Sequence, residues 1–326
     1  MKKLIVNGAE QLYGEVSAGG AKNAAVAIIP ATVLARGRCV LENVPDIHDT
    51  ELLFSMLRAM GATVEKISRT SAIIDTSTLT ESTVPYELSK HMRASYYFIG
   101  SLLGRFGQAC VSMPGGCNFG VRPIDQHIKG FEAMGAMVEQ AGGYVCADAP
   151  KGGLRGGHVY LDIVSVGATM NILLAAVLCS GMTIIENCAK EPHIVDLANF
   201  LNAMGAQISG AGTDVIKVRG VKALHGGCYS IIPDQIEAGT YMAAAAAVGR
   251  NITPADGETS PSTSTASPPS CVRSARTSRS MTTPSASNPP TACTARTSRP
   301  CRTPASRPIC SRRSPSVWPP PSAPAL

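Results

Sequence analysis

The chain contains 326 residues, 44% of them hydrophobic, which is enough for one large or two ordinary domains. Its formal net charge is +6, but residues 251–326 contain nine arginines and only two acidic residues, so residues 1–250 carry a net charge of −1. The nearly neutral charge of this larger part argues against a nucleic-acid-binding or membrane-surface protein and favours a small-molecule site.

The cysteines and the N-terminus indicate a cellular compartment. Residues 1–250 contain seven of the eleven cysteines, without a CxxC pair or a His/Cys zinc spacing, which favours reduced thiols and no metal. Residues 1–6 contain only a three-residue apolar run, too short for a signal-peptide core, and no apolar span of 18 residues follows. We therefore expect a cytoplasmic protein.

Three segments share one helix pattern. The first begins at Asp49, an expected N-cap, and the second near Pro123, which suits a first helical turn; the third contains apolar residues at helical spacing over 194–204. Each ends in Met-Gly-Ala, and these sequences begin at residues 60, 134 and 204, which are 74 and 70 residues apart. This regularity predicts one α/β unit used three times.

Other apolar segments complete the predicted elements. Residues 92–103 and 166–178 are typical of buried helices, and the short runs 39–41 and 182–185 of strands. The sequence therefore predicts an α/β fold with internal repetition up to about residue 250.

A glycine-rich segment surrounds Cys117. Gly115, Gly116 and Gly120 lie close to the thiol, and Arg122 follows just before the second predicted helix. A lone cysteine is more often an inert buried residue. The flexible glycine setting and the nearby cation instead favour a functional thiol on a loop.

These residues resemble a known family. Gly-Gly-Cys followed by Gly-x-Arg-Pro-x-Asp-x-His is similar to the active-site loop of the bacterial UDP-N-acetylglucosamine (UDP-GlcNAc) enolpyruvyl transferases, the UDP-GlcNAc 1-carboxyvinyltransferases. The other matching motifs are Lys22-Asn23, Arg93-Ala94-Ser95, Ser165 to Thr169, Glu191 to Asp196 and Pro233 to Thr240. The sister family that makes 5-enolpyruvylshikimate 3-phosphate shares the fold but lacks the cysteine loop, which makes it the weaker alternative.

The resemblance runs from Met1 to about Gly249 and implies a domain organisation. Residues 22–229 would form an inverse α/β barrel-like domain of three repeated units, the enolpyruvyl transferase fold. Residues 1–21 and 230–250 would be the remnant of a second domain that is largely missing. Residues 251–326 would be a disordered, low-complexity tail.

The resemblance also implies an activity. Enzymes of this family transfer the enolpyruvyl group of phosphoenolpyruvate to the 3-hydroxyl of UDP-GlcNAc and release phosphate, the first committed step of peptidoglycan synthesis. No metal or other cofactor, nucleic acid, membrane or obligate protein partner is implied. Cys117 would be the general acid and the target of fosfomycin. The implied substrate-binding residues are Lys22, Asn23, Arg93, Arg122, Pro123, Ile124, Asp125, Gln126, Ser165, Val166 and Gly167.

Two interpretations remain open for several of these side chains. The three cations could bind the carboxylate and phosphate of phosphoenolpyruvate or be solvated surface charges. His127 has helical spacing with apolar residues, so it could be a core histidine or a functional one.

The tail departs from the family pattern. With suitable codons, a one-base shift of the reading frame would convert residues 269–279 and 303–311 into segments similar to the family, which predicts an insertion or deletion near codon 250. Because this tail has too few apolar residues to replace half of a two-domain cleft, we expect negligible transferase activity from the chain as written. The alternative is a non-catalytic protein that binds UDP-GlcNAc.

Overall fold

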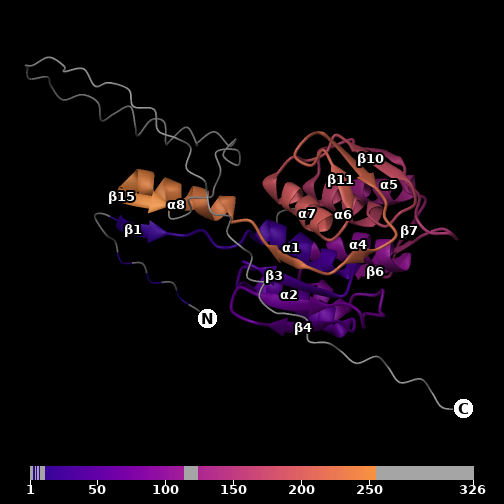
Figure 1. Ribbon diagram of the computed structural model, residues 1–326, viewed down its shortest axis with the longest axis horizontal. Coiled ribbons are helices and arrows are strands. Elements are labelled where there is room, and N and C mark those ends of the chain that lie inside the picture. The colour runs from indigo at the N-terminus through magenta and orange to yellow at the C-terminus, as the bar shows by residue number, and fades with distance from the viewer. Residues whose placement is uncertain (1–2, 4, 6, 8–11, 114–123, 255–326) are drawn as a thin grey trace, which may run out of the picture. The chain divides into compact units, whose positions relative to one another are not determined.

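The computed structural model describes residues 3, 5, 7, 12–113 and 124–254, all of which belong to one compact unit of the chain (Figure 1). Cys117, Arg122, Pro123 and the tail from residue 255 onward lie outside the described residues, and so do the expectations made for them. Within the described ranges, no helix is long and apolar enough to cross a membrane.

Helices and short strands alternate through the described chain. The helices are α1 (Lys22–Ala31), α2 (His48–Ala59), α3 (Tyr86–Ser89), α4 (Tyr97–Phe106), α5 (Asp125–Ala133), α6 (Val166–Ala176), α7 (Pro192–Ala203) and α8 (Gln235–Val248), with 3-10 turns η1 (Thr32–Leu34) and η2 (Arg93–Tyr96). The strands are β1 (Leu12–Val16), β2 (Ala35–Arg36), β3 (Arg38–Glu42), β4 (Thr63–Lys66), β5 (Ala72–Asp75), β6 (Gln108–Ser112), β7 (Met137–Ala141), β8 (Tyr144–Asp148), β9 (His158–Tyr160), β10 (Met182–Glu186), β11 (Gln207–Ser209), β12 (Val215–Arg219), β13 (Leu224–His225), β14 (Cys228–Ser230) and β15 (Gly249–Pro254).

Three sheets repeat one topology, which confirms the predicted repetition. In each unit a strand leads into a helix, and two further strands return so that the last one pairs antiparallel with both others. The orders are β3-β5-β4, β6-β8-β7 and β10-β12-β11, with helices α2, α5 and α7.

The end of the third unit closes back on the first. Strand β14 pairs parallel with β3, as β9 does with β10, and a bridge from Thr83 to Cys110 occupies the same place beside β6. The Tyr229 hydroxyl on β14 also donates a 2.5 Å hydrogen bond to the Asp196 carboxylate on α7. These contacts fix residues 228–230 against both the first and the third unit.

The Met-Gly-Ala sequences end the three outer helices in the same way. Gly61, Gly135 and Gly205 have φ values of 98°, 90° and 103°, in the left-handed region that favours glycine. The following alanine N–H donates to the carbonyl five residues back: Ala62 to Leu57 at 2.9 Å, Ala136 to Phe131 at 3.0 Å and Ala206 to Leu201 at 3.0 Å. This is the Schellman cap, and it explains why the sequence repeats here.

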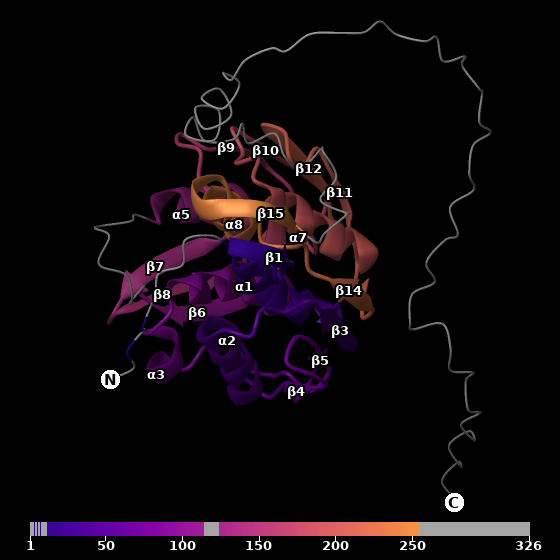
Figure 2. The same cartoon turned by 90° about the vertical axis from the view of Figure 1, so that its left-hand side faces the viewer.

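Helices α1, α4 and α6 form the core, with the sheets around them, as expected for an inverse barrel (Figure 1). Figure 2 shows α1 near the centre, with β7 and β8 on one side and β3 and β14 on the other. All residues of α6 from Ala168 to Ala176 are buried, whereas β3 and β10 bury alternate side chains. The central helices α4 and α6 approach closely at Gly100, whose added Cβ would lie 2.2 Å from the Asn171 carbonyl oxygen.

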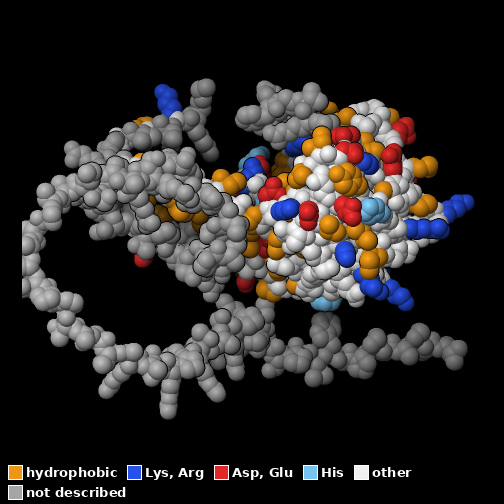
Figure 3. Space-filling model, turned by 90° about the horizontal axis from the view of Figure 1, so that it is seen from above, with side chains coloured by type: hydrophobic (Ala, Val, Ile, Leu, Met, Phe, Trp, Pro, Cys, Tyr) orange, Lys and Arg blue, Asp and Glu red, His pale blue; other side chains and the backbone are white. Residues whose placement is uncertain are grey.

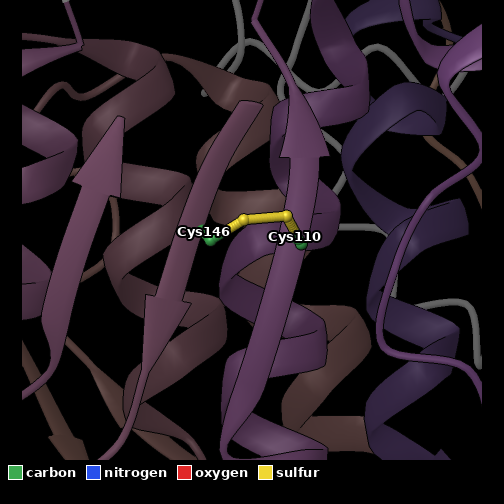
Figure 4. The surroundings of a disulfide bond; sticks show 2 residues. All are labelled: Cys110 and Cys146. Atoms are coloured by element: carbon green, nitrogen blue, oxygen red, sulfur yellow. A yellow bond between two sulfur atoms is a disulfide. The ribbon is translucent and has the colours of Figure 1, made fainter. Parts of the chain in front are cut away.

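Two local expectations were wrong. Helix α2 begins at His48 with Ile47 as its N-cap, so Asp49 lies in the first turn, where its charge still favours the positive end of the helix dipole. Cys110 and Cys146 form a disulfide across the paired strands β6 and β8, although the cysteine pattern favours reduced thiols (Figure 4). Sequence spacing could not reveal this pair, because the antiparallel register brings residues 36 apart face to face.

Helix α8 differs from the core helices, although its sequence is equally apolar. It contacts the parallel pair β1 and β15, which form a two-stranded sheet. Ile236 is 61% exposed and Met242 is 50% exposed. Strand β15 runs to Pro254, so regular structure extends four residues beyond Arg250.

Helix α8 and strands β1 and β15 are called the α8 group, and two chain segments join this group to the three units. The Ala21 N–H donates to the Ile232 carbonyl at 2.8 Å, and the Asp234 N–H donates to the Gly19 carbonyl at 2.8 Å. Gly20 has no room for a side chain, because an added Cβ would lie 1.7 Å from the Asn43 carbonyl oxygen. The two chain segments are therefore packed tightly against each other and against the end of β3.

We predict that Gly100→Ala destabilises the fold more than Gly135→Ala. The first adds a methyl group into a backbone contact and should cost about 3 kcal/mol of unfolding free energy, whereas the second only strains a left-handed cap and should cost about 1 kcal/mol. Urea unfolding at pH 7 measures both values, with Glu132→Ala on the exposed face of α5 as a near-neutral control. Equal effects of the two glycine substitutions would contradict the close helix approach.

Candidate functional site

A cavity of about 480 Å³ lies where the N-terminal ends of three core segments meet. Helix α1 contributes Lys22 and Asn23, turn η2 contributes Arg93, and helix α6 follows Ser165. Its lining includes Lys22, Asn23, Asp49, Arg93, Tyr96, His127, Ser165, Val166 and Gly167. Six of these residues were predicted to bind substrate, and they come from positions more than 140 residues apart, which is roughly the span that two repeats of this fold would cover.

The α6 end of the cavity offers backbone hydrogen-bond donors. Ser165 is the N-cap, and its Oγ accepts the Ala168 N–H at 3.3 Å. The N–H groups of Val166 and Gly167, in the first turn, have no partner within the helix by the geometry of an α-helix. Together with the helix dipole, they make this end favourable for a negatively charged group.

The α1 side of the cavity contains a cation and a carboxylate. The Lys22 Nζ lies 2.5 Å from the Asp49 Oδ2, and the Lys22 backbone N–H donates to Asp234 at 3.1 Å. Lys22 is about half exposed, so its ion pair with Asp49 is screened by water. A ligand anion that contacts the ammonium group therefore competes with the Asp49 carboxylate.

His127 is both buried and part of the cavity lining. Its environment therefore fits in part a core histidine and in part a functional one. Its exposed fraction is 7%, and its Nδ1 lies 3.0 Å from the Asn171 Nδ2. Burial lowers the pKa of His127 to about 4, and the nearby charge of Arg93 contributes in the same direction. The imidazole is therefore neutral at pH 7.

Three of the predicted binding residues lie apart from the cavity lining. Ile124 is buried just before α5, and Asp125 is exposed in its first turn. The Gln126 Oε1 accepts the Asp162 N–H at 2.8 Å, and its amide nitrogen lies 3.2 Å from the Asp162 carboxylate. The structure thus brings together the predicted residues on α1, η2 and α6 but not these three.

The position of the cysteine segment can be compared among the three units. Five residues, 43–47 and 187–191, connect the first strand to the helix in units one and three, and each begins with an asparagine at positive φ. In unit two the same connection is 113–124, which is twelve residues long. The segment with Cys117 is therefore an insertion at a repeated position.

Sequence reasoning missed Tyr96 and Asn171. Tyr96 is 3% exposed, its hydroxyl has no hydrogen-bond partner among the described residues, and burial raises its pKa. Asn171 is fully buried inside α6. Asn171 is the one side-chain amide in the mostly apolar run 166–176, which was a usable signal, whereas nothing in the sequence distinguished Tyr96. No cluster of His, Cys, Asp and Glu within the described ranges could hold a metal ion.

Comparison with known proteins agrees with this architecture. The model of the family described as EPSP synthase (3-phosphoshikimate 1-carboxyvinyltransferase) matches residues 6–265. The solved structure of the enolpyruvyl transferase NikO from Streptomyces tendae superimposes with a TM-score of 0.65 at 25% identity, over 74% of this chain and 58% of that one. An EPSP synthase from Acinetobacter baumannii, at 20% identity and a TM-score of 0.59, shares the fold.

Curated relatives are more similar in sequence. A UDP-N-acetylglucosamine 1-carboxyvinyltransferase 3 from Caldanaerobacter subterraneus subsp. tengcongensis is 56% identical over 252 residues, which cover 77% of this chain and 60% of the relative. A UDP-N-acetylglucosamine 1-carboxyvinyltransferase 2 from Clostridium acetobutylicum is 56% identical over 254 residues, 78% of this chain and 60% of the relative. The chain thus spans about 60% of the length of these relatives.

The threefold α/β fold with a cavity at its helix N-termini defines a protein of the enolpyruvyl transferase class. The chain belongs to the EPSP synthase family of carboxyvinyltransferases. Within that family, its matched part is similar to the UDP-N-acetylglucosamine 1-carboxyvinyltransferases.

We predict that His127 makes the folded protein less stable in mild acid. Its folded pKa of about 4 lies below the ordinary value of 6.5, so the unfolded state binds a proton first as pH falls from 6.5 towards 4. Unfolding free energy should therefore drop by roughly 2 kcal/mol from pH 7 to pH 5 through this group. Urea unfolding of the wild type and His127→Gln at both pH values isolates the contribution, and an identical loss in both proteins would contradict it.

Proposed function

We propose that this chain carries the cysteine-loop half of a UDP-GlcNAc 1-carboxyvinyltransferase. The reaction transfers the enolpyruvyl group of phosphoenolpyruvate to the 3-hydroxyl of UDP-GlcNAc and releases phosphate. The cavity that joins Lys22, Arg93 and the N-terminus of α6 carries the proposal, because both substrates bear phosphate groups. The more than 50% identity to relatives with this name supports it over the shikimate-pathway reaction.

The chemistry assigns roles to the predicted residues. Lys22, Arg93 and Arg122 would bind the anionic groups, with Asn23 and residues 124–126 and 165–167 holding the sugar nucleotide. Addition needs a proton delivered to the methylene carbon and a base that removes the proton of the sugar hydroxyl. Cys117 would supply the first proton, since an unperturbed thiol with a pKa of about 8.5 is protonated at neutral pH. The adduct would then lose phosphate by elimination.

The cysteine would also be the site at which fosfomycin reacts. In the cell the reaction would take place in the cytoplasm as a step of peptidoglycan synthesis, and so support cell-wall biogenesis, cell shape and cell division. The insertion of seven extra residues around Cys117, relative to the connections of units one and three, supports a functional loop in unit two.

We further propose that residues 22–229 are the cysteine-loop enolpyruvyl transferase domain of three repeats, and that residues 1–21 and 230–250 belong to a second, incomplete domain. The exposed apolar residues of α8 support this division, because α6, a helix of similar composition in the three units, is buried from Ala168 to Ala176. A non-catalytic UDP-GlcNAc-binding protein is then the alternative for the chain as written. It is favoured by the same exposed helix.

We predict that the full chain binds UDP-GlcNAc and that Arg93→Ala weakens binding at least tenfold, since a charge-assisted contact in a partly enclosed cavity would be lost. Isothermal titration calorimetry measures both affinities. Arg69→Ala is the matched control, because the Arg69 side chain is 89% exposed and lies on the β4–β5 turn. Tighter binding of shikimate 3-phosphate than of UDP-GlcNAc would overturn the proposed substrate.

We predict negligible release of phosphate when the purified chain receives UDP-GlcNAc and phosphoenolpyruvate together. The reason is physical: a partly formed second domain cannot enclose the reacting groups and exclude water. A colorimetric phosphate assay checks this, with a complete relative of the same name as the positive control. Turnover comparable to that control would show that the described residues suffice for catalysis.

A further inference from the structure

The side-chain amide of Asn171 has a defined orientation. Its Oδ1 accepts the Gly100 N–H at 2.8 Å, and a backbone N–H can only donate. Its Nδ2 lies 2.8 Å from the Tyr96 carbonyl oxygen, which can only accept. The reverse orientation would place donor against donor and acceptor against acceptor, so the two backbone groups fix the amide.

This orientation determines which nitrogen of His127 carries the proton. The second N–H of the Asn171 amide points to the His127 Nδ1 at 3.0 Å, so Nδ1 must accept. A neutral imidazole has one donor and one acceptor nitrogen, and the ring is neutral because its pKa is lowered by burial and by Arg93. The proton therefore lies on Nε2.

The Nε2 side of the ring faces the cavity. A Cβ added to Gly167 would lie 3.1 Å from Nε2, and both His127 and Gly167 line the cavity. The side chain of His127 is buried, and its other ring nitrogen, Nδ1, is occupied by the contact with Asn171. A histidine held for packing alone would not need a fixed proton on the side of the cavity.

We propose that His127 is a substrate-binding residue that donates its Nε2–H to an anionic oxygen of the bound sugar nucleotide beside the N-terminus of α6. Asn171 is the positioning residue that holds the required tautomer. The inference rests on the proposed function, because it takes the ligand to be UDP-GlcNAc. The position between the Arg93 charge and the first turn of α6 favours a phosphate oxygen over a neutral group.

The experiment combines two variants with a spectroscopic measurement on the full chain. His127→Gln places an amide N–H near the position of Nε2, whereas His127→Asn keeps a partner for Asn171 but does not reach the cavity. We expect the dissociation constant for UDP-GlcNAc to rise less than threefold for His127→Gln and at least tenfold for His127→Asn. Isothermal titration calorimetry measures both, after circular dichroism has confirmed that each variant is folded.

Proton–nitrogen NMR of histidine-labelled protein reports the tautomer directly. The signal of His127 is assigned by its loss in His127→Gln. We expect Nε2 to be protonated in the free protein and its resonance to shift when UDP-GlcNAc is added. A merely structural histidine would show no such shift and no difference between the two variants.

The outcomes separate this inference from the proposed function. If the wild type binds UDP-GlcNAc but His127→Asn binds equally well, or if the proton lies on Nδ1, His127 is not the donor and the proposed function stands. If the wild type does not bind UDP-GlcNAc, the proposed function fails and the donation fails with it. Inorganic phosphate, titrated separately, shows whether the Nε2 signal responds to any anion. A signal that responds to inorganic phosphate but not to UDP-GlcNAc would overturn the sugar nucleotide as the ligand.

Discussion

The close approach of helices α4 and α6 is the contact on which the rest of the core depends. Gly100 leaves no space for a side chain against the backbone of Asn171, so the two helices lie in direct contact. The buried Asn171 amide then binds Gly100, Tyr96 and His127, which belong to α4, η2 and α5. Because each unsatisfied buried polar group would cost about 1–3 kcal/mol, this one side chain fixes the relative position of four elements.

Threefold repetition explains why a site forms at this end of the core. The three units place equivalent segments around one centre, so the starts of α1, η2 and α6 meet at one cavity. Repetition alone would give the cavity three equivalent sides. The charges differ, however: Lys22 pairs with Asp49 on one side, Arg93 lies on the second, and α6 offers backbone N–H groups on the third. The longer connection before α5 adds a further difference in unit two. Charged side chains of both signs are mixed on the part of the surface that Figure 3 shows in colour.

The sequence predicted those features that depend on local backbone chemistry or on a repeated pattern. Gly61, Gly135 and Gly205 could be recognised because a left-handed cap requires glycine at each equivalent place. The N-cap of α2 was wrong because Asp49 suits both a cap and a first turn, and only the tertiary contact with Lys22 decides between them. The Cys110–Cys146 pair and the contacts of Asn171 depend on strand register and helix packing, which spacing along the chain does not contain. The family resemblance, and not the spacing of residues, predicted that Lys22, Arg93 and Ser165 bind substrate. The fold explains why they lie together, because it brings the starts of α1, η2 and α6 to one cavity.

Helices α6 and α8 differ in how much of their apolar surface is buried, and this difference matters for the proposed binding and turnover. Both helices are rich in alanine and other apolar residues, yet α6 is buried from Ala168 to Ala176 while Ile236 and Met242 on α8 are at least half exposed. Burial of apolar surface contributes about 25 cal/mol per Å², so an exposed helix of this composition gains little from its own packing. The two chain segments near Gly20 and Asp234 hold the start of α8 against the three-unit core. Asp234 accepts hydrogen bonds from the first turns of both α1 and α8. The cavity residues on α1 are thus positioned by a contact that does not depend on the rest of the α8 group. Under the proposed function, the three units would therefore bind substrate without a complete second domain, whereas enclosure of the reacting groups would require one.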